Sequence, residues 1–377
     1  MSDVVRVGGR LVLHDRVEPG VVVVEDGLIT SVTFEDGGDS AALPFVAPGF
    51  VDVHVHGWGG HDAMGDAAGL DGMSRSLLQR GVTSFLPTAV TAPLATLIQF
   101  ADRVRGWMPG APPDGAEPLG FNLEGPFLSA ARRGAHDAAY LVDPAQVDEA
   151  ALEPLIDGLR LITVAPERPG ALSLIARLRA HGVAVSMGHS AATYEEARGG
   201  FAAGGTTTTH VFNAMSGFDH RAPGLAVAAL LDDAAWVELI ADGQHVHPAI
   251  WEIIRRLKPV DRLLLVSDAI ALAGTGDGRA FVGGLEVEVV GGRVTLAGTA
   301  TLAGSTIALD DAVRNLVGSG FALPAAVAAA SRNPLAMLGV TDRGRIEPGQ
   351  RADLVELDDA LRVRRVMRRG EWLDGAG

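Results

Sequence analysis

Eight short apolar runs, each ending in polar or glycine residues and followed by a helical stretch, limit the folds open to this chain. They lie at 49–57, 81–88, 119–127, 159–167, 182–190, 206–215, 237–246 and 262–270. Strands that alternate with helices form parallel sheets, so this α/β pattern predicts a closed (β/α)8 TIM-like barrel. The alternative is an open doubly wound sheet. Such a sheet usually carries a glycine-rich phosphate loop after its first strand, and the GWGG sequence at 57–60 lacks that spacing.

Two β-rich ends flank this middle section. Residues 4–13 and 20–34 alternate as short strands around turns, and 352–358 and 362–370 have the same character. Neither end has enough residues to build a core of its own. We therefore expect both ends to pair into one small β-sandwich domain.

The predicted domain boundaries follow from this pairing. The small domain comprises 1–47 and 340–377, and the barrel comprises 48–339. Residues 279–300 interrupt the barrel after the eighth run, where a Gly-Gly turn predicts a β-hairpin insertion.

Charge and cysteine content exclude several classes of partner and site. The chain of 377 residues has 31 Lys and Arg against 46 Asp and Glu, a net charge of −15. Such a surface opposes binding to polyanions, so we expect no nucleic-acid or membrane partner. The absence of cysteine excludes disulfides, thiolate metal sites and cysteine nucleophiles, and it is compatible with a reducing cytoplasm. The sequence contains neither a signal-peptide core nor a run approaching ~20 apolar residues. We therefore expect a cytoplasmic location.

Polar side chains occur where the predicted strands end, which is the face on which such barrels perform chemistry. Imidazole and carboxylate groups without thiolate suit zinc, iron, manganese or cobalt. Taken singly, each residue has a structural interpretation; Asp268, for example, could cap the next helix. Their recurrence at the same end of successive strands favours a metal centre formed by some of these residues: His54, His56, Glu124, His189, His210, Asn213, His245 and Asp268.

Lysine usage bears on the kind of metal centre. One branch of binuclear barrel hydrolases bridges its metal ions with a carboxylated lysine. Lys258 is the only lysine, and it follows a helical segment rather than a strand. Glu124 is therefore the carboxylate available to bridge two ions.

Several segments together resemble the amidohydrolase superfamily and, within it, the N-acetylglucosamine-6-phosphate deacetylase family. They span nearly the whole chain and include APGFVDVHVHG, NLEGPFLS, RGAH, SMGHS, THVFNAMS, RAPG, IADGQHVHP, LVSDAIALAG and PGQRADLVELD. No single segment is specific for the family, but their combination is.

The resemblance implies a role for each candidate residue. It implies a metal site formed by Glu124, His189 and His210, and it makes Asp268 the catalytic acid and base. It also implies that His136 polarises the acetyl carbonyl. The implied substrate contacts are Ala135, His136, Asn213, the backbone of Ala214, Arg221, His245, Leu302, Ala303 and Gly304.

The first-strand histidines affect the expected number of metal ions. Because His54 and His56 are both present, we expect one or two divalent ions per subunit. Zinc is the first choice, with iron, manganese, cobalt or nickel as alternatives.

The implied reaction is hydrolysis of the acetamide of N-acetyl-D-glucosamine 6-phosphate to glucosamine 6-phosphate and acetate, in amino-sugar catabolism and cell-wall recycling. The resemblance also implies a homodimer, with a basic residue reaching the phosphate across the interface. Two alternatives remain: deacetylation of another N-acyl sugar or N-acyl amino acid, and a non-catalytic scaffold. A scaffold should lack expected ligands, and this sequence lacks none of them.

Overall fold

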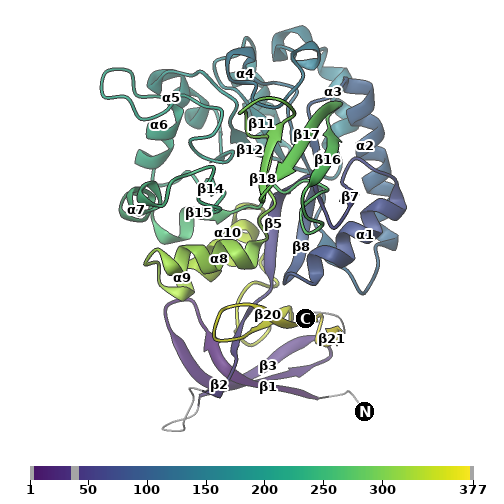
Figure 1. The fold of residues 1–377 in the computed structure, drawn as a ribbon, viewed down its shortest axis with the longest axis vertical. Helices are drawn as coiled ribbons and strands as arrows, with labels where there is room; N and C mark the ends of the chain where they lie inside the picture. Colours follow the sequence, from purple (N-terminus) through teal and green to yellow (C-terminus); the bar gives the residue numbers. More distant parts are fainter. Residues whose placement is uncertain (1–3, 35–41, 374–377) are drawn as a thin grey trace.

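A ring of parallel strands forms the larger part of the molecule (Figure 1). The computed structural model describes residues 4–34 and 42–373. All the predicted strand positions are occupied, by β5 (Phe50–Val55), β8 (Val82–Val90), β10 (Phe121–Glu124), β11 (Leu159–Val164), β12 (Ala184–Met187), β13 (Thr207–Thr208), β14 (Val237–Leu239) and β15 (Leu263–Leu265).

Backbone hydrogen bonds close this ring. The strands from β5 to β13 follow one another in a single sheet, and β14 pairs with β15. Between β13 and β14, the amide of Val211 donates to the carbonyl of Glu238 over 2.7 Å. Between β15 and β5, the amide of Asp268 donates to the carbonyl of His54 over 2.9 Å. The predicted barrel fold is confirmed.

Helices cover the outside of the barrel, so its strands are buried on both faces. All nine residues of β8 are buried, as expected for a parallel strand between a packed interior and a helical layer. The helices are α1 (Ala67–Leu78), α2 (Leu94–Trp107), α3 (Glu149–Ile156), α4 (Ala171–Ala180), α5 (Tyr194–Ala202), α6 (Leu225–Leu231), α7 (Pro248–Leu257), α8 (Leu309–Gly318), α9 (Leu323–Ala330) and α10 (Arg332–Met337). No helix in the described part of the chain combines the length and the apolar character needed to cross a membrane.

Strands from both chain ends form a separate sheet, called here the sheet unit, below the barrel in Figure 1. It has seven strands in the order β21-β20-β19-β4-β1-β2-β3. Their bounds are β1 (Val5–Val12), β2 (Val17–Glu25), β3 (Leu28–Phe34), β4 (Phe45–Pro48), β19 (Leu354–Leu357), β20 (Val363–Arg368) and β21 (Glu371–Leu373). Its buried core draws on both ends of the chain, for example on Leu11, Ile29 and Leu354.

The sheet unit curls so that the turn between β20 and β21 meets the turn between β2 and β3. A Cβ on Gly370, after β20, would lie 2.8 Å from the Cα of Gly27, after β2. The predicted pairing of the two chain ends is therefore observed, but as one continuous hydrogen-bonded sheet that folds back on its core. The domain boundaries at 47/48 and 339/340 stay a prediction. Three segments of the predicted small domain, 1–3, 35–41 and 374–377, lie outside the described residues.

The insertion after the eighth barrel strand contains one strand more than expected. It forms an antiparallel sheet of β16 (Gly278–Val282), β17 (Leu285–Val290) and β18 (Arg293–Leu296). Two Gly-Gly turns, at 283–284 and 291–292, reverse the chain twice. Val282 packs against Val90 and Ile270 at the barrel strand ends. The insertion therefore covers the face on which the predicted site lies.

Candidate active site

Three of the predicted metal ligands converge on one point. Oε1 of Glu124, at the end of β10, lies 2.9 Å from Nε2 of His210 and 3.0 Å from Nε2 of His189. The two Nε2 atoms are 3.2 Å apart. Ligands held at about 2.0–2.1 Å from a tetrahedral zinc ion are ~3.3 Å from one another. These three atoms therefore have the spacing required to share one ion.

A second group of ligand atoms adjoins the first. Nε2 of His56 lies 3.3 Å from Nε2 of His54, 3.1 Å from Oδ1 of Asp268 and 3.2 Å from Oε2 of Glu124. These four buried residues can together hold a metal ion. Glu124 directs one oxygen at each group, so it is placed to bridge two cations.

Unusual backbone conformations aim these side chains inward. His189, His210 and Asp268 have positive φ values of 46°, 28° and 51°. Residues other than glycine rarely adopt this region, and such strain concentrates at functional sites. Here it turns the chain at the strand ends, where these side chains converge on Glu124 and His56.

Hydrogen bonds at the far side of the rings orient the histidines. Nδ1 of His56 lies 3.1 Å from the carbonyl of Thr88, and Nδ1 of His189 lies 3.0 Å from that of Arg132. A carbonyl can only accept, so each Nδ1 carries the hydrogen. When each ring is neutral, its Nε2 therefore presents a lone pair to the centre, as metal ligation requires.

Glu238 on β14 is a supporting residue that the sequence analysis missed. It is fully buried. Its Oε2 lies 3.2 Å from Nδ1 of His54 and accepts from the amide of His210, and its Oε1 accepts from the hydroxyl of Ser186. The sequence signal that could have identified Glu238 is a glutamate within the apolar VELI run. Its carboxylate fixes the ring of His54 and the backbone of His210 together.

The electrostatics favour ionised carboxylates. Burial raises the pKa of Glu124, but the positive field of His136 and His54 outweighs burial and holds this pKa well below its usual value. Burial likewise opposes ionisation of Asp268, but the hydrogen bond from His56 lowers its pKa to about 2. Both groups are anionic at neutral pH, which is the state that binds a cation.

The histidines differ in their titration. Burial lowers the pKa of His210, but Glu124 and Asp268 outweigh it and raise this pKa. Burial, followed by the charge of His136, lowers the pKa of His189 to about 4, so this ring is neutral. Burial also lowers the pKa of His56, but Asp268 and Glu124 outweigh it and raise the pKa to about 9. A cation that binds His56 must displace a proton from this ring, whereas the neutral ring of His189 has none to lose from Nε2.

The site opens into a cavity of about 360 Å³. His136 lies in its wall, and Nδ1 of that ring is 2.9 Å from the hydroxyl of Thr91. His245 is oriented by Asp242, whose Oδ2 lies 2.7 Å from its Nδ1. Most of the predicted substrate contacts line this cavity: Ala135, His136, Asn213, Ala214, His245, Leu302, Ala303 and Gly304.

Arg221 is the exception among the predicted contacts. It is exposed, it does not line the cavity of its own chain, and its amide donates to Oδ1 of Asp219 in a surface turn. Its predicted contact with the substrate stays a prediction. Arg132, which the sequence analysis did not select, does line the cavity.

Comparisons with known proteins agree with this geometry. A model of the amidohydrolase family matches residues 45–373. N-acetylgalactosamine-6-phosphate deacetylase from Escherichia coli O157:H7 is 39% identical over 368 residues, covering 96% of this chain and 93% of that protein. N-acetylglucosamine-6-phosphate deacetylase from Bos taurus is 40% identical over 342 residues, covering 86% of this chain and 82% of that protein.

A solved structure extends the likeness to three dimensions. It is an aspartate-to-alanine mutant of N-acetyl-D-glucosamine-6-phosphate deacetylase from Mycobacterium smegmatis in complex with N-acetyl-D-glucosamine-6-phosphate. It superposes with a TM-score of 0.89 and 35% identity, covering 98% of this chain and 99% of that one.

Proposed function

This chain belongs to the amidohydrolase family, and we propose that it hydrolyses N-acetyl-D-glucosamine 6-phosphate to glucosamine 6-phosphate and acetate, in amino-sugar catabolism and cell-wall recycling. The observation that carries the proposal is the convergence of Glu124, His189 and His210 beside Asp268, in a cavity large enough for a small ligand. A non-catalytic scaffold would not need to keep these ligand atoms together.

Glu124, His189 and His210 would hold a divalent ion, and His54, His56, Asp268 and Glu124 would hold a second. The donor set favours zinc, with iron, manganese, cobalt or nickel as alternatives. Such an ion supplies Lewis acidity and lowers the pKa of water to ~7.

Asp268 and His136 would perform the proton transfer and polarisation. The ionised carboxylate of Asp268 takes the proton of the attacking water and returns a proton to the leaving amine, which would otherwise depart poorly. His136 contacts Thr91 through Nδ1, and its Nε2 points toward Glu124, at 3.3 Å from Oε2. Protonated at Nε2, this ring stabilises the negative charge that develops on the carbonyl oxygen.

The sugar phosphate would bind along the cavity wall. Asn213 and the backbone of Ala214 line one side, and His245 and Arg132 supply polar and cationic groups. Guanidinium groups suit phosphate because they form two parallel hydrogen bonds. We further propose a cytoplasmic homodimer in which Arg221 of one subunit reaches the phosphate in the other; the exposed position of Arg221, away from its own cavity, supports this arrangement.

A second candidate substrate is N-acetyl-D-galactosamine 6-phosphate, since the relative from E. coli that covers 96% of this chain is named for it. Other N-acyl sugars and N-acyl amino acids are the wider alternatives. The test is acetate release from both phosphorylated sugars and from unphosphorylated N-acetylglucosamine, with metal content measured on the same sample. We expect preference for a phosphorylated sugar and loss of activity on chelation. Equal rates with and without the phosphate would favour another N-acyl substrate.

A further inference from the structure

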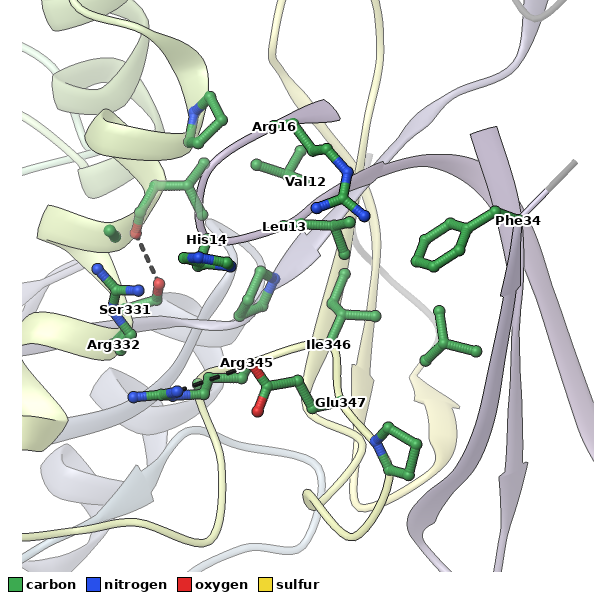
Figure 2. Close-up of a pocket in the computed structure, with 17 residues that line it drawn as sticks. Val12, Leu13, His14, Arg16, Phe34, Ser331, Arg332, Arg345, Ile346 and Glu347 are labelled. Carbon is green, nitrogen blue, oxygen red and sulfur yellow. Dashed lines mark hydrogen bonds and ion pairs between the residues drawn. The ribbon is translucent and has the colours of Figure 1, made fainter. Parts of the chain in front are cut away.

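A second cavity, called here the junction pocket, lies between the sheet unit and helices α9 and α10 (Figure 2). Its volume is about 300 Å³. Pro48 forms part of its wall and lies just before β5, whose other end carries His54 and His56. The junction pocket and the active site therefore lie at opposite ends of the same strand.

Two arginines in this pocket lack a full counter-charge among the residues that the structure describes. Arg332 is half-buried, and its side chain makes no hydrogen bond or ion pair with any described residue. The nearest carboxylate oxygen to Arg345 is on Glu347 at 3.7 Å, which is too long for a hydrogen bond. Burial, and then the charge of Arg345, lowers the pKa of Arg332 despite the opposing fields of Asp261 and Glu347. That direction is expected for a cation short of partners.

Other arginines show that the shortage is local. Arg16, on the opposite wall, donates to Oε2 of Glu18 over 2.6 Å and to Oδ1 of Asp15 over 3.2 Å. The chain carries 46 acidic residues against 31 basic ones, so partners are plentiful elsewhere. Of the three guanidinium groups in the pocket, only that of Arg16 has a hydrogen-bonded carboxylate among the described residues, which is unusual in so acidic a protein.

The rest of the wall is largely apolar. Val12, Val327 and Ile346 line it, and Phe34 lies on the side away from Arg332 and Arg345 (Figure 2). The volume lies at the lower end of the ~300–1,000 Å³ range of small-molecule sites. The pocket thus offers Arg332 and Arg345 at one end and a mainly apolar surface at the other, where the guanidinium of Arg16, paired with Glu18, lies 5.5 Å from the centre of the Phe34 ring.

We propose that the junction pocket binds a small organic oxyanion. Its phosphate or carboxylate group pairs with Arg332 and Arg345, which can each donate two parallel hydrogen bonds. Its apolar body lies against Phe34, Val327 and Ile346. This site is independent of the proposed deacetylation, because no residue lines both cavities.

The test is calorimetric titration of the metal-loaded protein with phenyl phosphate, benzoate and inorganic phosphate. We expect one of the two aromatic anions to bind at least tenfold more tightly than inorganic phosphate, and the tighter one identifies the acidic group. Arg332→Gln and Arg345→Gln should each weaken that binding at least tenfold. The matched control is Arg6→Gln, an exposed arginine of β1 outside the pocket, which should bind like the wild type.

Arg332 makes no polar contact among the described residues, so its replacement should leave the melting temperature unchanged. As a second variant, Ala328→Phe fills the pocket without altering its charge and should also abolish binding. Failure of the wild type to bind either aromatic anion would overturn the proposal. Binding that survives in both Arg332→Gln and Arg345→Gln would also overturn the proposal, because that binding belongs to the active site. Acetate release is measured separately, so failure here leaves the proposed function untouched.

Discussion

Two clusters of charged residues in this molecule behave oppositely. The arginine cluster joins the sheet unit to the barrel through Glu117 and Asp353 with Arg343, Arg351, Arg368 and Arg369. Glu117 lies between β8 and β10, within 2.6 Å of Arg351 and 3.0 Å of Arg343. In this cluster every carboxylate meets guanidinium donors. At the active site, carboxylate oxygens and imidazole lone pairs face one another at similar distances.

This difference shows how charged side chains serve either structure or chemistry. In the arginine cluster, guanidinium donors matched to carboxylate acceptors neutralise each other and hold the sheet unit against the barrel. Acceptors that converge on acceptors repel unless a cation lies between them. The backbone follows the same division, because positive φ values accumulate at the strand ends of the active site, for example at His189 and Asp268.

The largest predicted effect is that of Glu124→Gln. A neutral amide keeps the shape of the side chain but loses the charge that joins both ligand groups. We expect metal content to fall to background after dialysis and acetate release to disappear. Glu117→Gln is the matched control and should keep both. A Glu124→Gln protein with full metal content and an unchanged rate would refute the contrast between the two clusters.

Asp268→Asn should separate catalysis from metal binding at the site formed by Glu124, His189 and His210. Loss of a general acid and base lowers kcat by ~10²–10⁴-fold. Metal at Glu124, His189 and His210 should remain, because Asp268 does not approach those three atoms as a ligand. The check is single-turnover acetate release with metal analysis. A rate near that of the wild type would remove Asp268 from its assigned role.

Glu238→Gln tests the support behind the ligands. The amide can still accept from Ser186, but it no longer holds Nδ1 of His54 with a charge. Changes at such supporting residues lower metal affinity or activity by ~10–100-fold. We expect weaker metal binding and an unchanged KM at saturating metal. A change in KM alone would indicate a different role.

The smallest effect on activity is expected from Glu117→Gln, which instead costs stability. Breaking a buried ion pair costs ~3–5 kcal/mol, and Glu117 keeps some solvent contact, so we expect about 3 kcal/mol. Activity per folded molecule should be unchanged. Urea unfolding and the acetate assay measure the two quantities.

The stability cost of Glu117→Gln depends on pH because the pKa of Glu117 differs between the folded and unfolded states. Burial raises the pKa of Glu117, but Arg351, Arg343 and Arg369 outweigh burial and lower it overall. The folded state then holds the carboxylate ionised at a pH where the unfolded state is protonated. The contribution of Glu117 to stability is complete above its pKa in the unfolded state, about 4.3. It is lost as the pH falls through the pKa of the folded state. The stability difference between the wild type and Glu117→Gln should therefore shrink below pH ~4; a difference that grows there would contradict this explanation.

The sequence predicts the barrel because its signals are local. Apolar runs of strand length and the residues that end helices recur along the chain, and parallel strands bring their carboxyl ends together. Glu124, His189 and Asp268 were therefore predictable as neighbours. Long-range features were less accessible. Whether two β-rich ends make one sheet or two depends on pairing across more than 300 residues.

Two misses have separate physical causes. Glu238 was hidden within an apolar strand, and its role depends on β14 lying beside His54 and His210. Arg132 belongs to a loop, and loop conformation has no periodic signal. Arg221 is a different case. It was selected by resemblance, the turn that carries it lies outside the cavity of its own chain, and its contact with the substrate stays a prediction.

Acceptor atoms that converge on one another mark a cation site. Anomalous scattering of zinc in crystals of the zinc-loaded protein tests this directly. We expect a peak about 2.0–2.1 Å from Oε1 of Glu124 and from Nε2 of His189 and His210. Zinc that binds only elsewhere, with these three atoms still in mutual contact and no peak between them, would contradict it.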